Sequence, residues 1–250
     1  MKSSFGVRTF RTVRGVDAVA AIAAEPASSA LLLDVDGVLA PIVERPEDAA
    51  VPPETRAELA RLADRYGLVA CVTGRSGEVA RALVGNGRIQ VVGQHGLELH
   101  PDAAKWAERI HDFARASSWP DLELKPLTAA FHYRSASDHE AARQALEVVA
   151  TRALDEGFRT KWGRLVLEVV PPVDASKGTA VRTLLAESGL RRALYAGDDV
   201  TDLDGFRALD GLDAAVRVAV VSTEGPTELG ELADVVVGSP EAFLELLRRL

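Results

Sequence analysis

Hydrophobic and polar positions fall into blocks along this chain. Several short runs consist almost entirely of aliphatic residues, without the alternation of a strand that has one solvated face. Such runs are typical of strands buried on both faces of a parallel sheet. They occupy residues 30–35, 68–73, 89–93, 193–197, 216–222 and 234–238.

Patterns typical of helices separate several of these runs. Residues 53–67 have a proline at the start and Gly67 at the end, and residues 174–190 form a second such segment. Val16, Val19 and Ile22 predict a short amphipathic helix before the first run. The alternation predicts an α/β fold with a doubly wound, Rossmann-like parallel sheet.

The middle third of the chain has a different rhythm. Residues 103–117 and 138–157 have helical patterns, and each is followed by a segment of strand character with fewer buried runs. Pro171 and Pro172 indicate a linker back to the first pattern. We therefore predict a core domain of residues 1–104 and 173–250, with a smaller α/β domain inserted at residues 105–172.

Charge and composition narrow the classes of ligand. The chain has 29 Lys and Arg against 37 Asp and Glu, a net charge of −8, which disfavours binding of nucleic acid or an anionic membrane through a basic face. No apolar run has the length of a membrane span. The single cysteine, Cys71, lies in an apolar run, so no disulfide framework exists and a cytoplasmic location is expected.

Polar residues follow the predicted strands where ligands bind in an open parallel sheet, beyond the carboxyl ends. Clustered carboxylates there would repel one another without a cation, and hard carboxylate oxygens select Mg²⁺. A lysine and a hydroxyl can hold the charge of a phosphoryl group, so the pattern predicts phosphoryl transfer. The residues expected at this edge are Asp34, Asp36, Thr73, Gly74, Arg75, Lys177, Asp198, Asp199 and Asp202.

The segments "DVDGVL", "TGR", "SKG" and "GDDVTD" resemble, in order, the four motifs of the haloacid dehalogenase superfamily of Mg²⁺-dependent phosphatases. The resemblance implies that Asp34 is the nucleophile and Asp36 the general acid and base. It further implies a phosphoryl contact from Thr73 and a charge clamp at Lys177. The implied metal ligands are the Asp34 carboxylate, the Asp36 backbone oxygen and Asp198, with Asp199 and Asp202 as further ligands or orienting residues.

Within that superfamily the chain is similar to trehalose-6-phosphate phosphatases, through "GQHGLEL", "FHYR", "WGRLVLEVVPP" and "YAGDDVTDLDGF". This resemblance implies a sugar-phosphate substrate, a trehalose-phosphate synthase acting upstream, and an inserted domain that acts as a cap over the substrate. We expect a monomer. The chain departs from the family at Val35, Val38, Leu203 and Gly205. The implied substrate contacts are Gly74, Arg75, His95, His132, Arg134, Lys161 and Glu168.

Two other functions remain open at this stage. A capped phosphatase for another sugar phosphate, such as sucrose phosphate or glucosyl-3-phosphoglycerate, would differ only in cap residues. A non-catalytic sugar-phosphate sensor or a regulatory partner of a synthase would be expected to lack a catalytic group, yet all are present. Calcium-loop, serine-hydrolase, Walker and dinucleotide-binding motifs do not fit the sequence.

Overall fold

The structure is a computed structural model that describes residues 11–12, 15–43, 45–163, 165–221 and 225–250. Two compact units emerge from it. The first, called the core unit, lies within Met1–Gly96 and Ala175–Leu250, and the second, called the insert unit, is Leu97–Asp174. The fold is α/β, as predicted.

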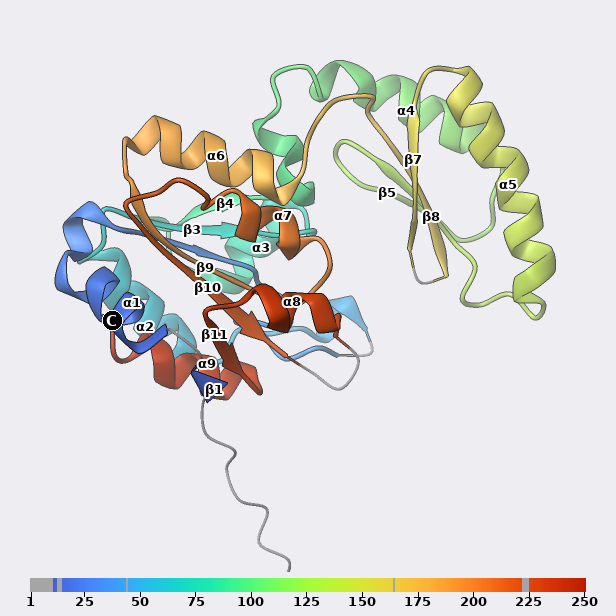
Figure 1. Ribbon diagram of the computed structural model, residues 1–250. Coiled ribbons are helices and arrows are strands. Elements are labelled where there is room, and N and C mark those ends of the chain that lie inside the picture. Colours follow the sequence, from blue (N-terminus) through green and yellow to red (C-terminus); the bar gives the residue numbers. More distant parts are fainter. Residues whose placement is uncertain (1–10, 13–14, 44, 164, 222–224) are drawn as a thin grey trace, which may run out of the picture. The chain divides into compact units, whose positions relative to one another are not determined.

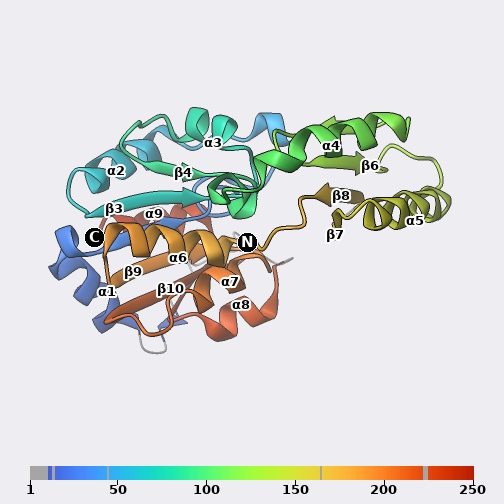
Figure 2. The same cartoon turned by 90° about the horizontal axis from the view of Figure 1, so that it is seen from above.

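A seven-stranded sheet runs through the core unit in the order β1-β11-β10-β9-β2-β3-β4. All neighbouring strands are parallel except for β1, which is antiparallel to β11. In Figure 2 the labelled strands β4, β3, β9 and β10 appear in this order across the sheet, with β2 between β3 and β9. The strands are β1 Arg11–Thr12, β2 Ala30–Leu33, β3 Leu68–Val72, β4 Gln90–Val92, β9 Arg192–Gly197, β10 Ala214–Val220 and β11 Val235–Val237.

Helices cover both faces of this sheet (Figure 1). Leu31 and Leu33 of β2 pack with α1, α2, α3 and α9, whereas Leu32 packs with α6, α7 and α8 on the opposite face. This arrangement explains the uninterrupted apolar runs of the sequence, because successive side chains of a strand pack against the helices on opposite faces of the sheet. The helices are α1 Gly15–Ala24, α2 Pro53–Ala63, α3 Gly77–Val84, α6 Lys177–Ser188, α7 Asp202–Arg207, α8 Thr227–Leu232 and α9 Pro240–Leu247, with 3-10 turns η1 Pro26–Ser28, η2 Pro46–Asp48 and η3 Gln94–Leu99.

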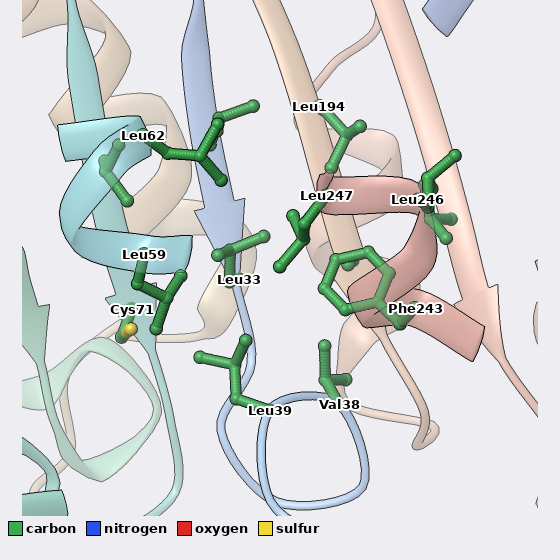
Figure 3. Packing of buried hydrophobic residues seen from close by; sticks show 14 of the residues in the cluster. Leu33, Val38, Leu39, Leu59, Leu62, Cys71, Leu194, Phe243, Leu246 and Leu247 are labelled. Atoms are coloured by element: carbon green, nitrogen blue, oxygen red, sulfur yellow. The ribbon is translucent and has the colours of Figure 1, made fainter. Parts of the chain in front are cut away.

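The first of these layers is close-packed (Figure 3). Leu59 and Leu62 of α2 and Phe243 of α9 meet Leu33 of β2, and Cys71 lies among them. Burial raises the pKa of the Cys71 thiol to about 12, so this residue is a small buried hydrophobe, as its sequence context predicts.

The insert unit has its own sheet and core. Its strands are all antiparallel, in the order β5-β6-β8-β7, and α4 and α5 pack on one face of the sheet. Phe131, Leu167 and Val169 point into this core, so the residues between them belong to the helix-free face. The elements are α4 Ala104–Ala116, β5 Leu122–Leu124, β6 Ala129–His132, α5 His139–Asp155, β7 Arg159–Gly163 and β8 Val166–Val170.

Some details differ from the sequence pattern. The helix α2 ends at Ala63 rather than at Gly67, whose N–H instead donates to the Pro26 carbonyl oxygen. The predicted amphipathic helix exists as α1, with Val19 and Ile22 buried; the Val16 side chain lies outside the described residues. In the described part of the chain, no helix is both long and apolar enough to cross a bilayer.

Candidate active site

Asp34 follows β2 directly, and both its backbone and its carboxylate are fixed by hydrogen bonds. Its backbone N–H donates to the Ala196 carbonyl oxygen at 2.9 Å, which continues the ladder to β9. Its Oδ1 accepts the Val35 N–H at 2.7 Å, and its Oδ2 accepts from the Lys177 Nζ at 2.6 Å. Asp34 is 5% exposed, and burial, reinforced by the Asp202 charge, raises its pKa to about 7.

Asp202, the first residue of α7, has all of its acceptor capacity in use. Its Oδ1 accepts from Lys177 Nζ and from the Tyr195 hydroxyl, each at 2.7 Å. Its Oδ2 accepts the backbone N–H groups of Asp198 and Asp199, each at 3.0 Å. Each carboxylate oxygen has two lone pairs, so Asp202 can accept from all four donors at once and fixes their orientation.

Lys177 is fixed at the start of α6, where Ser176 forms a capping box with Thr179. Its side chain is 2% exposed and bridges Asp34 and Asp202. Burial lowers the pKa of Lys177, but the charges and hydrogen bonds of the two carboxylates outweigh burial and hold the pKa above its usual value. Lys177 is therefore a buried, permanently charged ammonium.

Tyr195 reaches Asp202 because Gly205 leaves room for its ring. A β-carbon at Gly205 would lie 2.4 Å from Tyr195 Cζ, well inside contact distance. The ring also packs edge-on against Phe206. In this chain Gly205 therefore accommodates the tyrosine that donates to Asp202.

We expect Gly205→Ala to destabilise the core unit by about 1–3 kcal/mol, although alanine favours helices, because the new methyl group collides with the Tyr195 ring. Gly230→Ala in α8 is the matched control. Among the described residues its β-carbon would meet Val221 alone, at 3.8 Å, so helix propensity predicts a gain of about 0.5–1 kcal/mol. Chemical denaturation of both variants tests this, and equal effects would contradict the steric explanation.

Asp198 lies against the loop that follows β2. Gly37 has φ +72°, and a β-carbon there would lie 2.0 Å from Asp198 Oδ2, so only glycine lets this carboxylate reach the loop. One oxygen each of Asp34, Asp198 and Asp202 lie within 4.8 Å of one another. Burial and the neighbouring carboxylates raise the pKa of Asp198 to about 8.

This carboxylate cluster fits a divalent cation. The Asp198 carboxylate accepts no hydrogen bond from the described residues, and it lies beside the charge of Asp34. Hard oxygen donors crowded in this way suit Mg²⁺ or a similar ion. Asp199 is exposed and lies outside the cluster that the described residues form.

Asp36 is paired with Arg75 instead of joining the cluster. Arg75 Nε donates to Asp36 Oδ2 at 2.7 Å, and Nη2 donates to Oδ1 at 2.8 Å. The Arg75 Nη1 also donates to the Pro46 carbonyl oxygen at 2.9 Å. The bond to Asp36 raises the pKa of Arg75, so this guanidinium stays charged.

Thr73 and His95 meet at the end of β3. Thr73 is fully buried, and its Oγ1 accepts the Arg75 N–H at 3.2 Å. Its carbonyl oxygen accepts the His95 N–H at 2.9 Å. The His95 ring packs on Gly74, where a β-carbon would lie 2.7 Å from the ring. Gln94 and His95 both have positive φ, so a strained turn holds this segment in place.

The substrate contacts expected in the insert unit gather on its helix-free face. Lys161 and Glu168 are cross-strand partners on β7 and β8. His132 has the same facing at the end of β6, and it pairs with Glu123 at 2.9 Å between Nε2 and Oε2. Arg134 is exposed just beyond that strand.

Three residues of these sites were missed in the sequence. Lys125 Nζ and Thr128 Oγ1 donate to Glu168 Oε1 at 3.1 and 2.9 Å, and Tyr195 donates to Asp202. The tyrosine carried a weak signal, since a hydroxyl inside a doubly buried strand needs a partner. Lys125 and Thr128 lie outside the insert strands and carried no signal.

Val35 and Val38 are fully buried in the layer shown in Figure 3, where Val38 lies near Phe243. Their side chains contribute to the hydrophobic core of the core unit. Their departure from the family pattern is therefore a change in core packing.

Comparison with known proteins gives consistent results. The family model described as trehalose-phosphatase matches residues 32–119 and 120–231. A probable trehalose-phosphate phosphatase of Sinorhizobium fredii is 33% identical, over 84% of this chain and 86% of that protein. The trehalose-6-phosphate phosphatase of Escherichia coli is 30% identical, over 84% of each chain.

Solved structures agree on the fold. A trehalose-6-phosphate phosphatase related protein has a TM-score of 0.67 and 24% identity, and the match covers 88% of this chain and 95% of that one. A haloacid dehalogenase-like hydrolase from Bacteroides thetaiotaomicron has a TM-score of 0.63 and 15% identity, and the match covers 88% of this chain and 98% of that one.

Proposed function

The chain belongs to the trehalose-phosphatase family, and from this membership we propose that it hydrolyses trehalose 6-phosphate to trehalose and phosphate, a step of trehalose biosynthesis. One observation carries the proposal. At the carboxyl ends of β2 and β9, a buried lysine bridges two carboxylates beside a third, which is a site for a phosphoryl group and a cation.

The first step forms an aspartyl-phosphate. An Asp34 oxygen attacks phosphorus in line, the bond between phosphorus and the sugar oxygen breaks, and Asp36 gives its proton to that oxygen. Lys177 and the Thr73 hydroxyl hold the phosphoryl oxygens. Gly74 and the His95 ring that packs on it shape the surroundings of these oxygens. Fixing Lys177 between two carboxylates supports this role, because its charge is in place before the substrate arrives.

The second step releases phosphate. A water oxygen attacks phosphorus, its proton goes to Asp36, and the bond from phosphorus to the Asp34 oxygen breaks, which restores both carboxyl groups. We propose Mg²⁺ as the cation, held by the Asp34 and Asp198 carboxylates and the Asp36 backbone oxygen. When bound, this cation would neutralise negative charge on the phosphoryl group. Asp202 orients the site, and Asp199 remains a candidate for a water-mediated contact.

We propose that residues 105–172 act as a cap domain on a core of residues 1–104 and 173–250. The helix-free face of the insert unit then recognises the sugar. Glu168, together with Lys125 and Thr128 that donate to it, forms a group of charged and neutral hydrogen-bonding atoms suited to sugar hydroxyls. His132, Arg134 and Lys161 are further contacts on or beside that face.

The setting of the enzyme is also part of the proposal. The single, buried cysteine thiol supports a cytoplasmic protein, and we propose that a trehalose-phosphate synthase supplies its substrate. We propose a monomer, which light scattering of the purified protein tests directly.

Phosphate release from trehalose 6-phosphate, with Mg²⁺ and with a chelator, tests the proposed activity. Glucose 6-phosphate, sucrose 6-phosphate and glucosyl-3-phosphoglycerate provide the comparison. Selective, metal-dependent turnover of trehalose 6-phosphate is expected. Turnover of another sugar phosphate instead would support the phosphatase reaction with a different substrate. No turnover of any of the four compounds would favour a non-catalytic sugar-phosphate sensor.

We expect Glu168→Gln to raise KM for trehalose 6-phosphate by about 10-fold and to leave kcat/KM for 4-nitrophenyl phosphate unchanged, because a charged acceptor for sugar hydroxyls is lost. Steady-state kinetics on both substrates measure this. Glu147→Gln, which changes an exposed partner of Arg143 on α5, is the control and should alter neither value. An equal loss on both substrates would remove Glu168 from sugar recognition.

A further inference from the structure

The sequence predicts that Arg75 binds substrate, and it does not predict a contact between Arg75 and Asp36. In the structure the Arg75 guanidinium meets the Asp36 carboxylate as a fork, with Nε–Oδ2 at 2.7 Å and Nη2–Oδ1 at 2.8 Å. Bidentate pairs fix direction as well as distance. The two residues lie 39 positions apart in the sequence, so the fold itself creates the pair.

Arg75 is anchored independently of Asp36. Its Nη1 donates to the Pro46 carbonyl oxygen at 2.9 Å, its N–H donates to Thr73 Oγ1 at 3.2 Å, and its carbonyl oxygen accepts the Gln94 N–H at 2.8 Å. The side chain of Arg75 is 15% exposed. A guanidinium anchored in this way can impose its orientation on a partner.

Asp36 has no comparable anchor. Within the described residues, its carboxylate accepts hydrogen bonds from Arg75 alone, and its side chain is 32% exposed. It stands on a tight loop closed by the Gly37 and Ala40 backbone bonds. Without Arg75 this carboxylate would be free to rotate among rotamers in solvent.

We propose that Arg75 is a positioning residue that aims Asp36, and that it contributes to the reaction through Asp36 rather than by binding the phosphoryl group. The inference rests on the proposed function, in which Asp36 protonates the leaving oxygen. Lys177 already provides the buried cation for the phosphoryl group, so the site does not need Arg75 for that purpose.

The dependence of the rate on the leaving group distinguishes an Arg75 that positions Asp36 from an Arg75 that binds the phosphoryl group. A sugar alkoxide leaves poorly unless it is protonated, whereas 4-nitrophenolate leaves without a proton. The value of kcat/KM reports only steps up to formation of the aspartyl-phosphate, so the later activation of water does not affect it. Loss of a phosphoryl contact would slow both substrates equally.

The experiment measures kcat/KM of Arg75→Gln on trehalose 6-phosphate and on 4-nitrophenyl phosphate. We expect a loss of about 10- to 100-fold on the sugar ester and of less than about 3-fold on the aryl ester. Arg75→Lys, which keeps a charge but not the fork, should show the same selectivity with a smaller loss. Arg88→Gln, which removes an exposed pair with Asp64, is the matched control and should change neither value.

A second arm combines Arg75→Gln with Asp36→Asn. If Arg75 acts through Asp36, the double variant is no slower on the sugar ester than Asp36→Asn alone. An equal loss on both esters, or a further loss in the Asp36→Asn background, would overturn the Arg75 proposal and leave the proposed function intact. A wild-type protein that hydrolyses neither ester would overturn both.

Discussion

Asp34→Asn is expected to lower kcat for trehalose 6-phosphate by more than about 10³-fold, because an amide cannot supply the attacking oxygen of the proposed first step. The loss should be the same with 4-nitrophenyl phosphate, since both esters need the nucleophile. Phosphate release under single-turnover conditions measures the effect.

The matched control for this variant is Asp64→Asn. Asp64 pairs with Arg88 on the surface, and its replacement should leave kcat unchanged. Residual activity of Asp34→Asn within 10-fold of the wild type would remove Asp34 from the role of nucleophile.

The same variant has a predicted effect on stability versus pH. Burial raises the pKa of Asp34 from 3.8 to about 7, so the folded protein binds this proton more tightly than the unfolded chain does. The resulting stabilisation is complete below pH 3.8 and is lost as the pH rises through 7. Asp34→Asn lacks this loss.

In a chelating buffer, the Tm of Asp34→Asn relative to the wild type should therefore rise between pH 5 and pH 8. The charge of Asp34 contributes to the raised pKa of Asp198, so the Asp198 pKa falls in the variant, and this change adds to the expected rise in relative Tm. Thermal unfolding at the two pH values measures it. A Tm difference that falls over this range would contradict the sign of the Asp34 shift.

The fold and the edge that bears the site were predictable because buried parallel strands leave a local signal. Apolar runs mark β2, β3 and β9, and the polar residues Asp34, Thr73 and Asp198 stand directly after them. Strand direction then brings distant segments to one edge without any contact being known. The two-residue strand β1 carries no such signal, because two residues show no period.

Partnerships inside the site were not predictable, because they depend on pairs that lie far apart in the sequence. Arg75 pairs with Asp36 and Lys125 with Glu168, at separations of 39 and 43 residues. A charged residue at a strand end shows that a partner exists without showing which one. Tyr195 is the subtler case, because its partner Asp202 is near in sequence but is reached only through the gap at Gly205.

Lys177 is expected to be the residue on which both stability and activity depend most. Lys177→Met removes the cation that lies 2.6 Å from Asp34 and 2.7 Å from Asp202, and it leaves both carboxylates buried without a counter-charge. Removing one partner of a buried pair costs about 3–5 kcal/mol. We expect a loss of unfolding free energy of that size in a chelating buffer, together with a loss of kcat of more than about 10³-fold.

The control variant is Lys105→Met, which breaks only an exposed pair with Asp102. It should change the free energy of unfolding by less than about 0.5 kcal/mol.

A compensating change separates the two consequences of losing Lys177. Lys177→Met/Asp202→Asn also removes one of the uncompensated carboxylate charges, so a large part of the lost unfolding free energy should return, because the remaining cost is mostly that of a single buried charge. Activity should not return, since both variants lack the buried Lys177 charge that is proposed to hold the phosphoryl group. Denaturation and phosphate release, measured on the same preparations, decide the matter. Recovery of both stability and activity would mean that Lys177 acts only as a structural counter-charge. Recovery of stability alone would mean that Lys177 also stabilises the reacting phosphoryl group.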